Sequence, residues 1–134
     1  MAITAAMCNQ FKVDALNGVH QPADVYKLAL YTSAATLDKT TTAYTASGEV
    51  AAGGGYSAGG ITLSNFNVAL VGDTATLDFD DAVIATATIA NVVGAVLYNS
   101  TRSNKAMAVF SFASTTSTNA EFRVAIPSGL LSIT

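Results

Sequence analysis

The acidic residues that lie closest together in the sequence are Asp73, Asp78, Asp80 and Asp81. Carboxylate oxygens are the ligands that Ca²⁺ prefers, so this cluster could hold a hard cation. The sequence has no D-x-[DN]-x-[DN]-G loop, however. The spacing places Asp73 at one end of a short predicted strand and the adjacent residues Asp80 and Asp81 at the other end. Aspartate is common in turns because its side chain bonds to the nearby backbone. We therefore interpret the cluster as two turns and expect no metal site.

The chain has one histidine and one cysteine, the residue types that most often do nucleophilic or metal chemistry. His20 has Asp14 and Asp24 nearby in the sequence, and a Ser/His/Asp triad recurs in several chain orders. No segment resembles a nucleophile elbow, and the segment Gly-Val-His-Gln-Pro is typical of a loop. Cys8 falls on the apolar side of a predicted helix, where cysteine behaves as a small hydrophobic residue. A zinc set and an intramolecular disulfide are both excluded, and the sequence predicts that the protein is not an enzyme.

A glycine-rich segment gives the remaining motif of chemical interest. Gly53, Gly55 and Ala58 fit a loose G-x-G-x-x-A pattern. A dinucleotide site also needs a buried strand before this motif and a helix N-terminus after it. Here the threonine-rich segment before Gly53 and the strand-like Ile61 to Leu63 supply neither, so we expect no nucleotide and no other cofactor.

Composition points away from chemistry and toward assembly. The chain is 51% hydrophobic and only 11% charged, against about 25% charged residues in an average soluble domain. Its 25 Ala, 17 Thr, 11 Ser, 10 Gly and 8 Asn imply a surface of small neutral groups that loses little hydration free energy when it is covered. The composition favours a structural, assembling protein.

Charge and hydropathy also narrow the choice of partner. The net charge is −3, with a basic cluster only at Arg102 and Lys105, and this argues against nucleic acid. The uncharged run 82–101 is Ala-rich and interrupted by Thr86, Thr88 and Asn91, so we do not expect a membrane span. The N-terminus lacks the charged and apolar blocks of a signal peptide, so we expect synthesis in the cytoplasm.

At 134 residues the chain fits one domain, 1–134. An arm and a short helix are predicted over 1–18, with Thr4 as N-cap and Asn17-Gly18 ending the helix. Val25 to Thr32 alternates in polarity as a half-buried strand does. Residues 33–60 are rich in Gly, Thr and Ala and predict a long, exposed loop.

The second half of the chain predicts short strands separated by turn residues. A bulge is expected near Ser64-Asn65, where the apolar residues change parity. The C-terminal tail 130–133 is expected to pair at a sheet edge after a turn at Pro127-Ser128-Gly129. The strands are predicted at 61–70, 74–79, 84–89, 92–98, 106–112 and 119–126. This spacing predicts a mainly β fold, an antiparallel β-sandwich or a jelly-roll or barrel-like domain, with one short N-terminal helix.

Short segments spread over the chain carry a resemblance. They are Met1 to Thr4, Met7 to Lys12, Tyr26 to Thr32, Gly55 to Gly60, Phe79 to Asp81, Leu97 to Ser100 and Asn104 to Ala106. Together they resemble, nearly end to end, a family of small tailed-bacteriophage virion proteins. The resemblance implies a capsid decoration, or cement, protein that lies on the outer surface of the head and bridges and stabilises major capsid protein subunits. It implies the major capsid protein as partner, and a homo-oligomer, with a trimer preferred from the geometry of capsid lattices.

Two regions are expected to make the contacts with the capsid or with other copies. One is the N-terminal arm and helix, and the other is the 33–60 loop; each could instead have a local role, capping the sandwich or moving freely. The expected contact residues are Ile3, Thr4, Met7, Phe11, Tyr44, Gly53, Gly54, Gly55 and Tyr56. Two other functions stay open, a tail or connector component and a receptor- or glycan-binding module on the virion surface.

Overall fold

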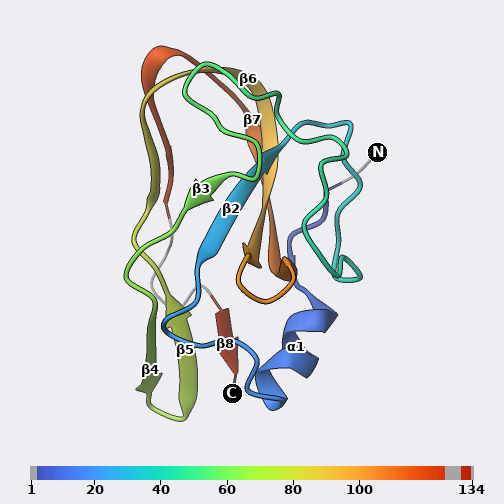
Figure 1. The fold of residues 1–134 in the computed structure, drawn as a ribbon, viewed down its shortest axis with the longest axis vertical. Helices are drawn as coiled ribbons and strands as arrows, with labels where there is room; N and C mark the ends of the chain where they lie inside the picture. Colours follow the sequence, from blue (N-terminus) through green and yellow to red (C-terminus); the bar gives the residue numbers. More distant parts are fainter. Residues whose placement is uncertain (1–2, 126–130, 134) are drawn as a thin grey trace.

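The computed structural model describes residues 3–125 and 131–133. The fold is mainly β, with 52% of residues in strands and 6% in helix, and its strands form two antiparallel sheets. The predicted mainly β fold class with one short N-terminal helix is confirmed in its sandwich-like form, and the described strands do not close into a barrel. Figure 1 shows the two sheets, with the helix α1 beside the smaller one.

The larger sheet contains most of the buried core. Leu28 and Leu30 of one strand are fully buried, as are Val96 and Leu97 of the neighbouring strand, where Leu97 lies opposite Leu28. These residues come from two strongly apolar segments, one rich in Tyr and Leu and the other in Val, which explains why they pair in the core. The strand order is β1 (Ala6–Met7), β7 (Lys105–Val124), β6 (Ala82–Asn99), β2 (Tyr26–Tyr31) and β3 (Ile61–Thr62).

The smaller sheet has the order β4 (Asn67–Val71), β5 (Thr74–Asp78), β8 (Leu131–Ile133). The predicted pairing of the tail is confirmed, since β8 pairs with β5 at the edge of this sheet. The predicted turn at 127–129 lies outside the described residues. Instead of one bulged strand over 61–70, the chain forms β3 in one sheet and β4 in the other, and Asn65 takes a positive φ between them.

One long hairpin, β6 with β7, replaces four predicted strands. The gaps between the predicted strands 84–89 and 92–98, and between 106–112 and 119–126, are wrong, because β6 and β7 bend there and continue. Asn91 and Asn119 adopt left-handed φ values of 58° and 51°, which asparagine tolerates better than most residues. The ladder shifts register several times between Ile84 and Gly94, so the hairpin curves over at the end of the molecule opposite α1 (Figure 1).

The helix α1 spans Asn9–Leu16 and not the longer segment that the sequence predicts. Thr4 is not its N-cap; Cys8 holds that position, and the Thr4 N–H donates to the Leu37 carbonyl instead. Pairing explains the correction, since β1 adds to the free side of β7 and so keeps Ala6–Met7 extended. In the described part of the chain, no helix is long and apolar enough to cross a membrane.

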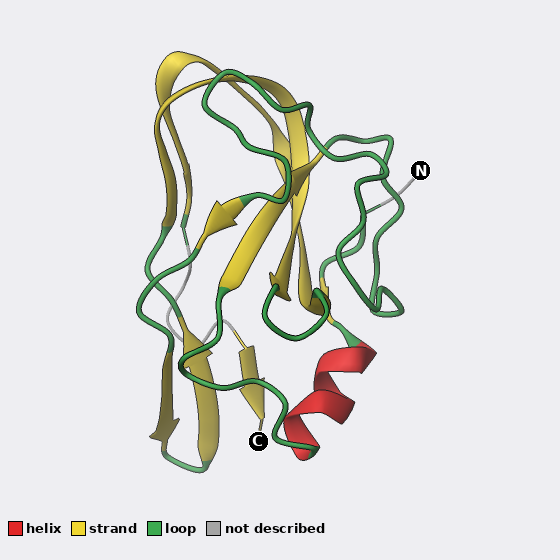
Figure 2. Cartoon of the chain, viewed as in Figure 1, coloured by secondary structure: helices red, strands yellow, loops and turns green. Residues whose placement is uncertain are grey.

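Residues 33–60 lack long regular elements, as predicted, but much of this loop is not exposed. Ala35, Leu37, Val50 and Tyr56 are buried in the core. This segment, drawn as loop in Figure 2 and coloured from cyan to green in Figure 1, therefore lies along the larger sheet and contributes side chains to the core. The prediction of an exposed excursion holds for several short stretches, at 33–34, 39–40, 46–47 and around the three glycines, and not for the whole loop.

Candidate docking surface

The strand β4 exposes apolar side chains at the edge of the smaller sheet. Val68, Leu70 and Val71 keep 58%, 72% and 66% of their surface exposed. No residue of the strand, Asn67-Val-Ala-Leu-Val71, is charged, and all five are exposed. Exposed apolar residues are ordinary when scattered, but several on one strand form a patch that points to an interaction.

Local sequence explains why the strand forms although it is so exposed. Gly72 and Asp73 connect β4 to β5 as a two-residue turn, and Gly72 takes the φ of +62° that such a hairpin turn requires. The register pairs Val68 with Leu77 and Leu70 with Ala75, so these four side chains share one face of the sheet. This shared face is apolar.

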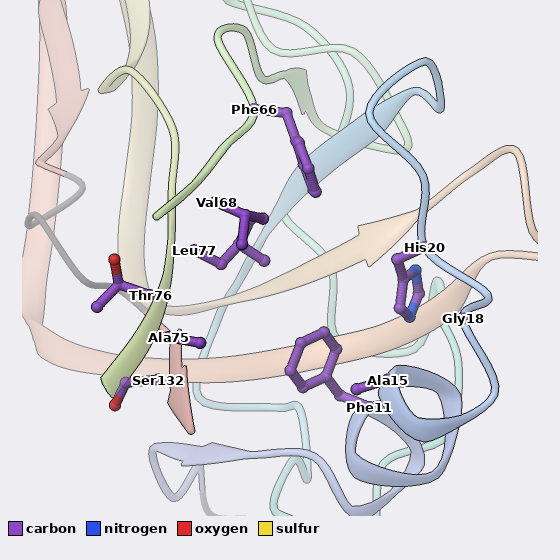
Figure 3. A pocket seen from close by; sticks show the side chains of 10 residues that line it. All are labelled: Phe11, Ala15, Gly18, His20, Phe66, Val68, Ala75, Thr76, Leu77 and Ser132. Carbon is purple, nitrogen blue, oxygen red and sulfur yellow. The ribbon is translucent and has the colours of Figure 1, made fainter. Parts of the chain in front are cut away.

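A cavity of about 220 Å³ lies between this face and the helix. Figure 3 shows Val68 and Leu77 on one side of it, and Phe11 and His20 on the other. Because Val68 lines the cavity while more than half of its surface is exposed, the cavity opens beside β4. The full lining is Phe11, Ala15, Gly18, His20, Phe66, Val68, Ala75, Thr76, Leu77 and Ser132.

Stacked rings fix the wall of the cavity that faces the smaller sheet. Phe11 stacks on His20 with 5.5 Å between ring centres, and Tyr26 stacks on Phe66 at 5.0 Å. Phe79 packs edge-on against Phe66, at 5.7 Å. These contacts join α1, β2 and the residues that flank β4 and β5 into one packed aromatic wall.

A buried polar network lies behind the aromatic wall. The Nδ2 of Asn99 donates to Nδ1 of His20 and to Oδ2 of Asp24, both at 2.9 Å. Because His20 Nδ1 accepts, the proton of the neutral ring lies on Nε2, which is 3.6 Å from Oδ2 of Asp14. This distance is too long for a hydrogen bond, so among the described residues His20 Nε2 and Asp14 Oδ2 are buried close to each other without a hydrogen-bond partner. Arg102 closes the network with two hydrogen bonds to Asp24, at 2.8 and 3.1 Å.

The electrostatics of this network indicate a structural role. The Arg102 guanidinium lowers the pKa of Asp24 to about 2, so this carboxylate stays charged. Burial lowers the pKa of His20, against the opposing effect of Asp14, and keeps the ring neutral. Cys8 is also buried, and burial with the nearby Asp38 raises its pKa to about 11, so the thiol stays protonated. The hydrogen bonds from Asn99 and Arg102 to His20 and Asp24 therefore hold residues 18–24 against the turn at residues 99–102.

The Glu49 carboxylate joins the long loop to the larger sheet. It accepts hydrogen bonds from the hydroxyls of Tyr44 and Tyr56, both at 2.6 Å, and from the Gly59 N–H at 2.8 Å. Tyr44 also stacks on Tyr98, whose hydroxyl donates to the Gly59 carbonyl. These bonds explain why a segment rich in Gly and Thr is ordered.

The N-terminal contact residues that the sequence predicts lie in different surroundings. Phe11 lines the cavity, so it belongs to the candidate docking surface. Thr4 is exposed, whereas Ile3 and Met7 are partly buried against the core. Ile3 covers Gly94, where an added Cβ would lie 2.8 Å from its side chain.

The predicted contact residues of the loop are on a different part of the molecule. Tyr56 is 3% exposed, and Tyr44 is partly buried against Tyr98. Gly53, Gly54 and Gly55 are exposed, although Gly54 accepts a backbone hydrogen bond from Thr88. The structure therefore does not bring the two predicted regions together into one site.

Sequence reasoning missed the three exposed residues of β4. The available signal was the uncharged apolar run between Asn65 and Gly72-Asp73, whose apolar side chains lie on both parities. A strand that is buried on one face alternates, and this one does not. The sequence alone does not say whether such a run is buried on both faces or exposed on both.

The acidic residues and the glycine segment take the roles that their turn positions suggest. Asp80 accepts from the Asn65 amide, and Asp81 pairs with Arg123 at 3.1 Å. The described residues contain no group of three or more His, Cys, Asp or Glu side chains that could hold a metal ion. The glycine segment leads into β3 and not into a helix.

Comparison with protein-family models, curated proteins and solved structures found no match.

Proposed function

We propose that the protein is a structural component of a bacteriophage virion, which binds the outer surface of the head and bridges major capsid protein subunits. The observation that carries the proposal is the uncharged strand β4, with Val68, Leu70 and Val71 exposed beside an open cavity. Such a surface is suited to being covered by another protein. The resemblance to small virion proteins supplies the kind of partner.

The free energy that this surface can contribute to binding favours a partner with many repeated sites over a single binding site. Full burial of a Val or Leu side chain contributes about 1.5 to 3 kcal/mol. Three such residues give several kcal/mol, while association costs at least about 4 kcal/mol in lost freedom. One patch of this size therefore binds weakly. Attachment to a lattice, where several contacts form at once, turns weak sites into stable binding.

A second surface lies at the far end of the molecule and makes bridging possible. Residues 82–101 and 106–120 contain no charged side chain. Where the hairpin bends, exposed residues such as Thr88, Asn91 and Thr118 leave a neutral polar surface. Figure 1 places this bend at the opposite end from β4. A protein with an uncharged apolar strand at one end and a neutral polar surface at the other can join two neighbours.

The test is to locate the protein in particles of the phage whose genome encodes it. We expect peptides of the chain in mass spectra of purified virions and matching density on the head exterior in electron microscopy. Particles without the protein should lose DNA at lower temperature and regain resistance when it is added back. Absence from purified virions, or density on the tail alone, would overturn the proposal.

A further inference from the structure

We infer that the open edge of β4 receives an extended segment of the partner protein, which adds a strand to the smaller sheet and places one apolar side chain in the cavity. The segment that fits has alternating apolar residues and basic residues at its two ends. This inference rests on the proposed function, because it describes how the head protein is held. It names a heterologous partner and not a second copy of this chain.

The backbone of β4 carries the first part of the argument. Among the described residues, β4 pairs only with β5 and lies at the end of the strand order of its sheet. In an antiparallel pair, alternate residues direct their N–H and C=O groups away from the partner strand. Unpaired edges without charge or proline readily take up another strand. β4 has neither between Asn67 and Val71. Its edge is ready to form a further ladder.

The second observation that supports the inference is the cavity beside β4. Strand addition gains specificity when alternate side chains of the added strand enter pockets. The volume of about 220 Å³ exceeds the roughly 150 Å³ of an engineered apolar cavity that binds benzene. A Leu or Phe side chain therefore fits it. Phe11, Phe66 and Leu77 would contact that side chain, and Val68 is the residue of β4 that both lines the cavity and is exposed.

Charge at the two ends of β4 selects the partner. Asp73 follows the strand in the β4–β5 turn and is exposed. Asp80 is also exposed and bonds to Asn65, which precedes the strand. Both ends of the edge are therefore acidic, and Lys or Arg residues that flank an apolar segment complement them.

The same charges disfavour pairing between two copies. A twofold antiparallel pair of β4 strands centred on Ala69 would set Asn65 of one copy opposite Asp73 of the other. Asp80, bonded to Asn65, would then approach Asp73 of the other copy. Like charges opposite each other across a sheet are destabilising. The second copy is therefore the poorer occupant of this edge.

A labelled peptide provides the direct test, with the whole chain as receptor. The probe is Lys-Lys-Val-Thr-Leu-Thr-Val-Lys-Lys, and fluorescence anisotropy measures its binding. One control peptide has Glu in place of every Lys, and another has N-methyl groups on alternate residues that block pairing. We expect saturable binding of the first peptide, weaker at high salt, and at least about tenfold weaker binding of both controls. Slower amide hydrogen exchange at Val68 and Leu70 should accompany binding.

Variants localise the site. Leu70→Lys adds a positive charge to the exposed edge and should weaken the peptide at least about tenfold. Leu16→Lys is the matched control, because Leu16 is 91% exposed but lies on α1 outside the strand; it should bind as the unchanged protein does. Asp73→Asn should reduce both the affinity and its salt dependence. Equal binding by Leu70→Lys and Leu16→Lys would overturn the inference.

Reattachment to virions separates this inference from the proposed function. If the protein and Leu70→Lys both bind stripped heads equally, the β4 edge is not the contact, while the decoration function stands. If the basic peptide binds but heads do not, the function fails and the edge site stands. A dimer that Leu70→Lys abolishes would show that a second copy occupies the edge, and would also overturn the inference.

Discussion

Asn99 is the residue on which the buried polar network depends. Its side chain is fully buried, its amide nitrogen donates to His20 and Asp24, and its amide oxygen accepts from the Thr101 N–H at 3.0 Å. An amide side chain suits this position because it has N–H groups that donate to His20 and Asp24 and an oxygen that accepts from the backbone. A carboxylate in its place would face two acceptors.

We therefore expect Asn99→Asp to lower the free energy of unfolding by about 2 to 4 kcal/mol, through lost bonds and an uncompensated buried charge. Urea denaturation followed by circular dichroism measures the change. Asn91→Asp is the control, since Asn91 is exposed and aspartate also tolerates a positive φ; its effect should stay within about 0.5 kcal/mol. Similar values for both variants would contradict a central role for Asn99.

Asp24 makes stability depend on pH in the acid range. Its pKa of about 2 lies below the ordinary 3.8, mainly because Arg102 donates to the carboxylate. A carboxylate whose pKa is lower in the folded state stabilises the fold above the unfolded pKa. That stabilisation is lost as pH falls from about 4 to about 2.

Arg102→Leu should remove much of this effect. We expect the variant to unfold at lower urea concentration than the unchanged protein at pH 7, with the two midpoints converging near pH 2. Arg123→Leu is the control, because Arg123 pairs with the more exposed Asp81 and Glu121, and exposed pairs contribute little. An Arg102 effect that stays constant from pH 7 to pH 2 would contradict this account.

The glycine segment and the β6–β7 hairpin are coupled at the scale of elements. Thr88 donates to the Gly54 carbonyl at 2.8 Å, and a Cβ on Gly54 would lie 2.1 Å from the Thr88 carbonyl oxygen. Gly72 has almost the same φ, +62° against +60°, but open space around it. Comparing an alanine substitution at Gly54 with one at Gly72 therefore distinguishes the cost of a steric clash from the cost of a positive φ.

We expect Gly54→Ala to cost at least about 2 kcal/mol more in unfolding free energy than Gly72→Ala. Both replacements place alanine at a left-handed φ, at about 1 kcal/mol, and only the first forces the loop off β6. Thermal or urea unfolding of both variants measures the difference. Equal costs would mean that the loop moves away from Thr88 without penalty.

Elements that depend on local pattern could be predicted from the sequence. The alternation over Tyr26 to Tyr31 predicts β2 because the whole signal lies in one stretch, but the strand is not half-buried as predicted, since Ala29 and Tyr31 on its second face are also buried. The continuity of β6 could not be predicted, since Asn91 favours a turn and a strand bend equally well. Long-range pairing also decided the start of α1, because β7 holds Ala6–Met7 as a strand. The cavity requires the relative positions of α1 and β4, which no local pattern contains.

At the scale of the whole molecule, the lack of charge at the hairpin bend bears on self-association. We expect light scattering of the isolated protein at high concentration to give a mass above 13.6 kDa. Thr118→Lys adds charge to the exposed bend and should shift the mass toward that of the monomer, whereas Ser33→Lys, also exposed but on the long loop, should not. A strict monomer at high concentration would contradict self-association and leave binding to capsids open.

The pairing of distant strands also sets the order in which the chain can fold during synthesis. β2 pairs with β6, so that Leu28 lies opposite Leu97, and β1 pairs with β7, so that Ala6 lies opposite Val109. The first third of the chain therefore leaves the ribosome without its partners. The β6–β7 hairpin can form by itself, because its two strands follow each other in the sequence. The pairings of β1 with β7 and of β2 with β6 join distant segments, and such non-local pairings form slowly. We expect the hairpin to form first and to serve as the template on which the earlier strands assemble.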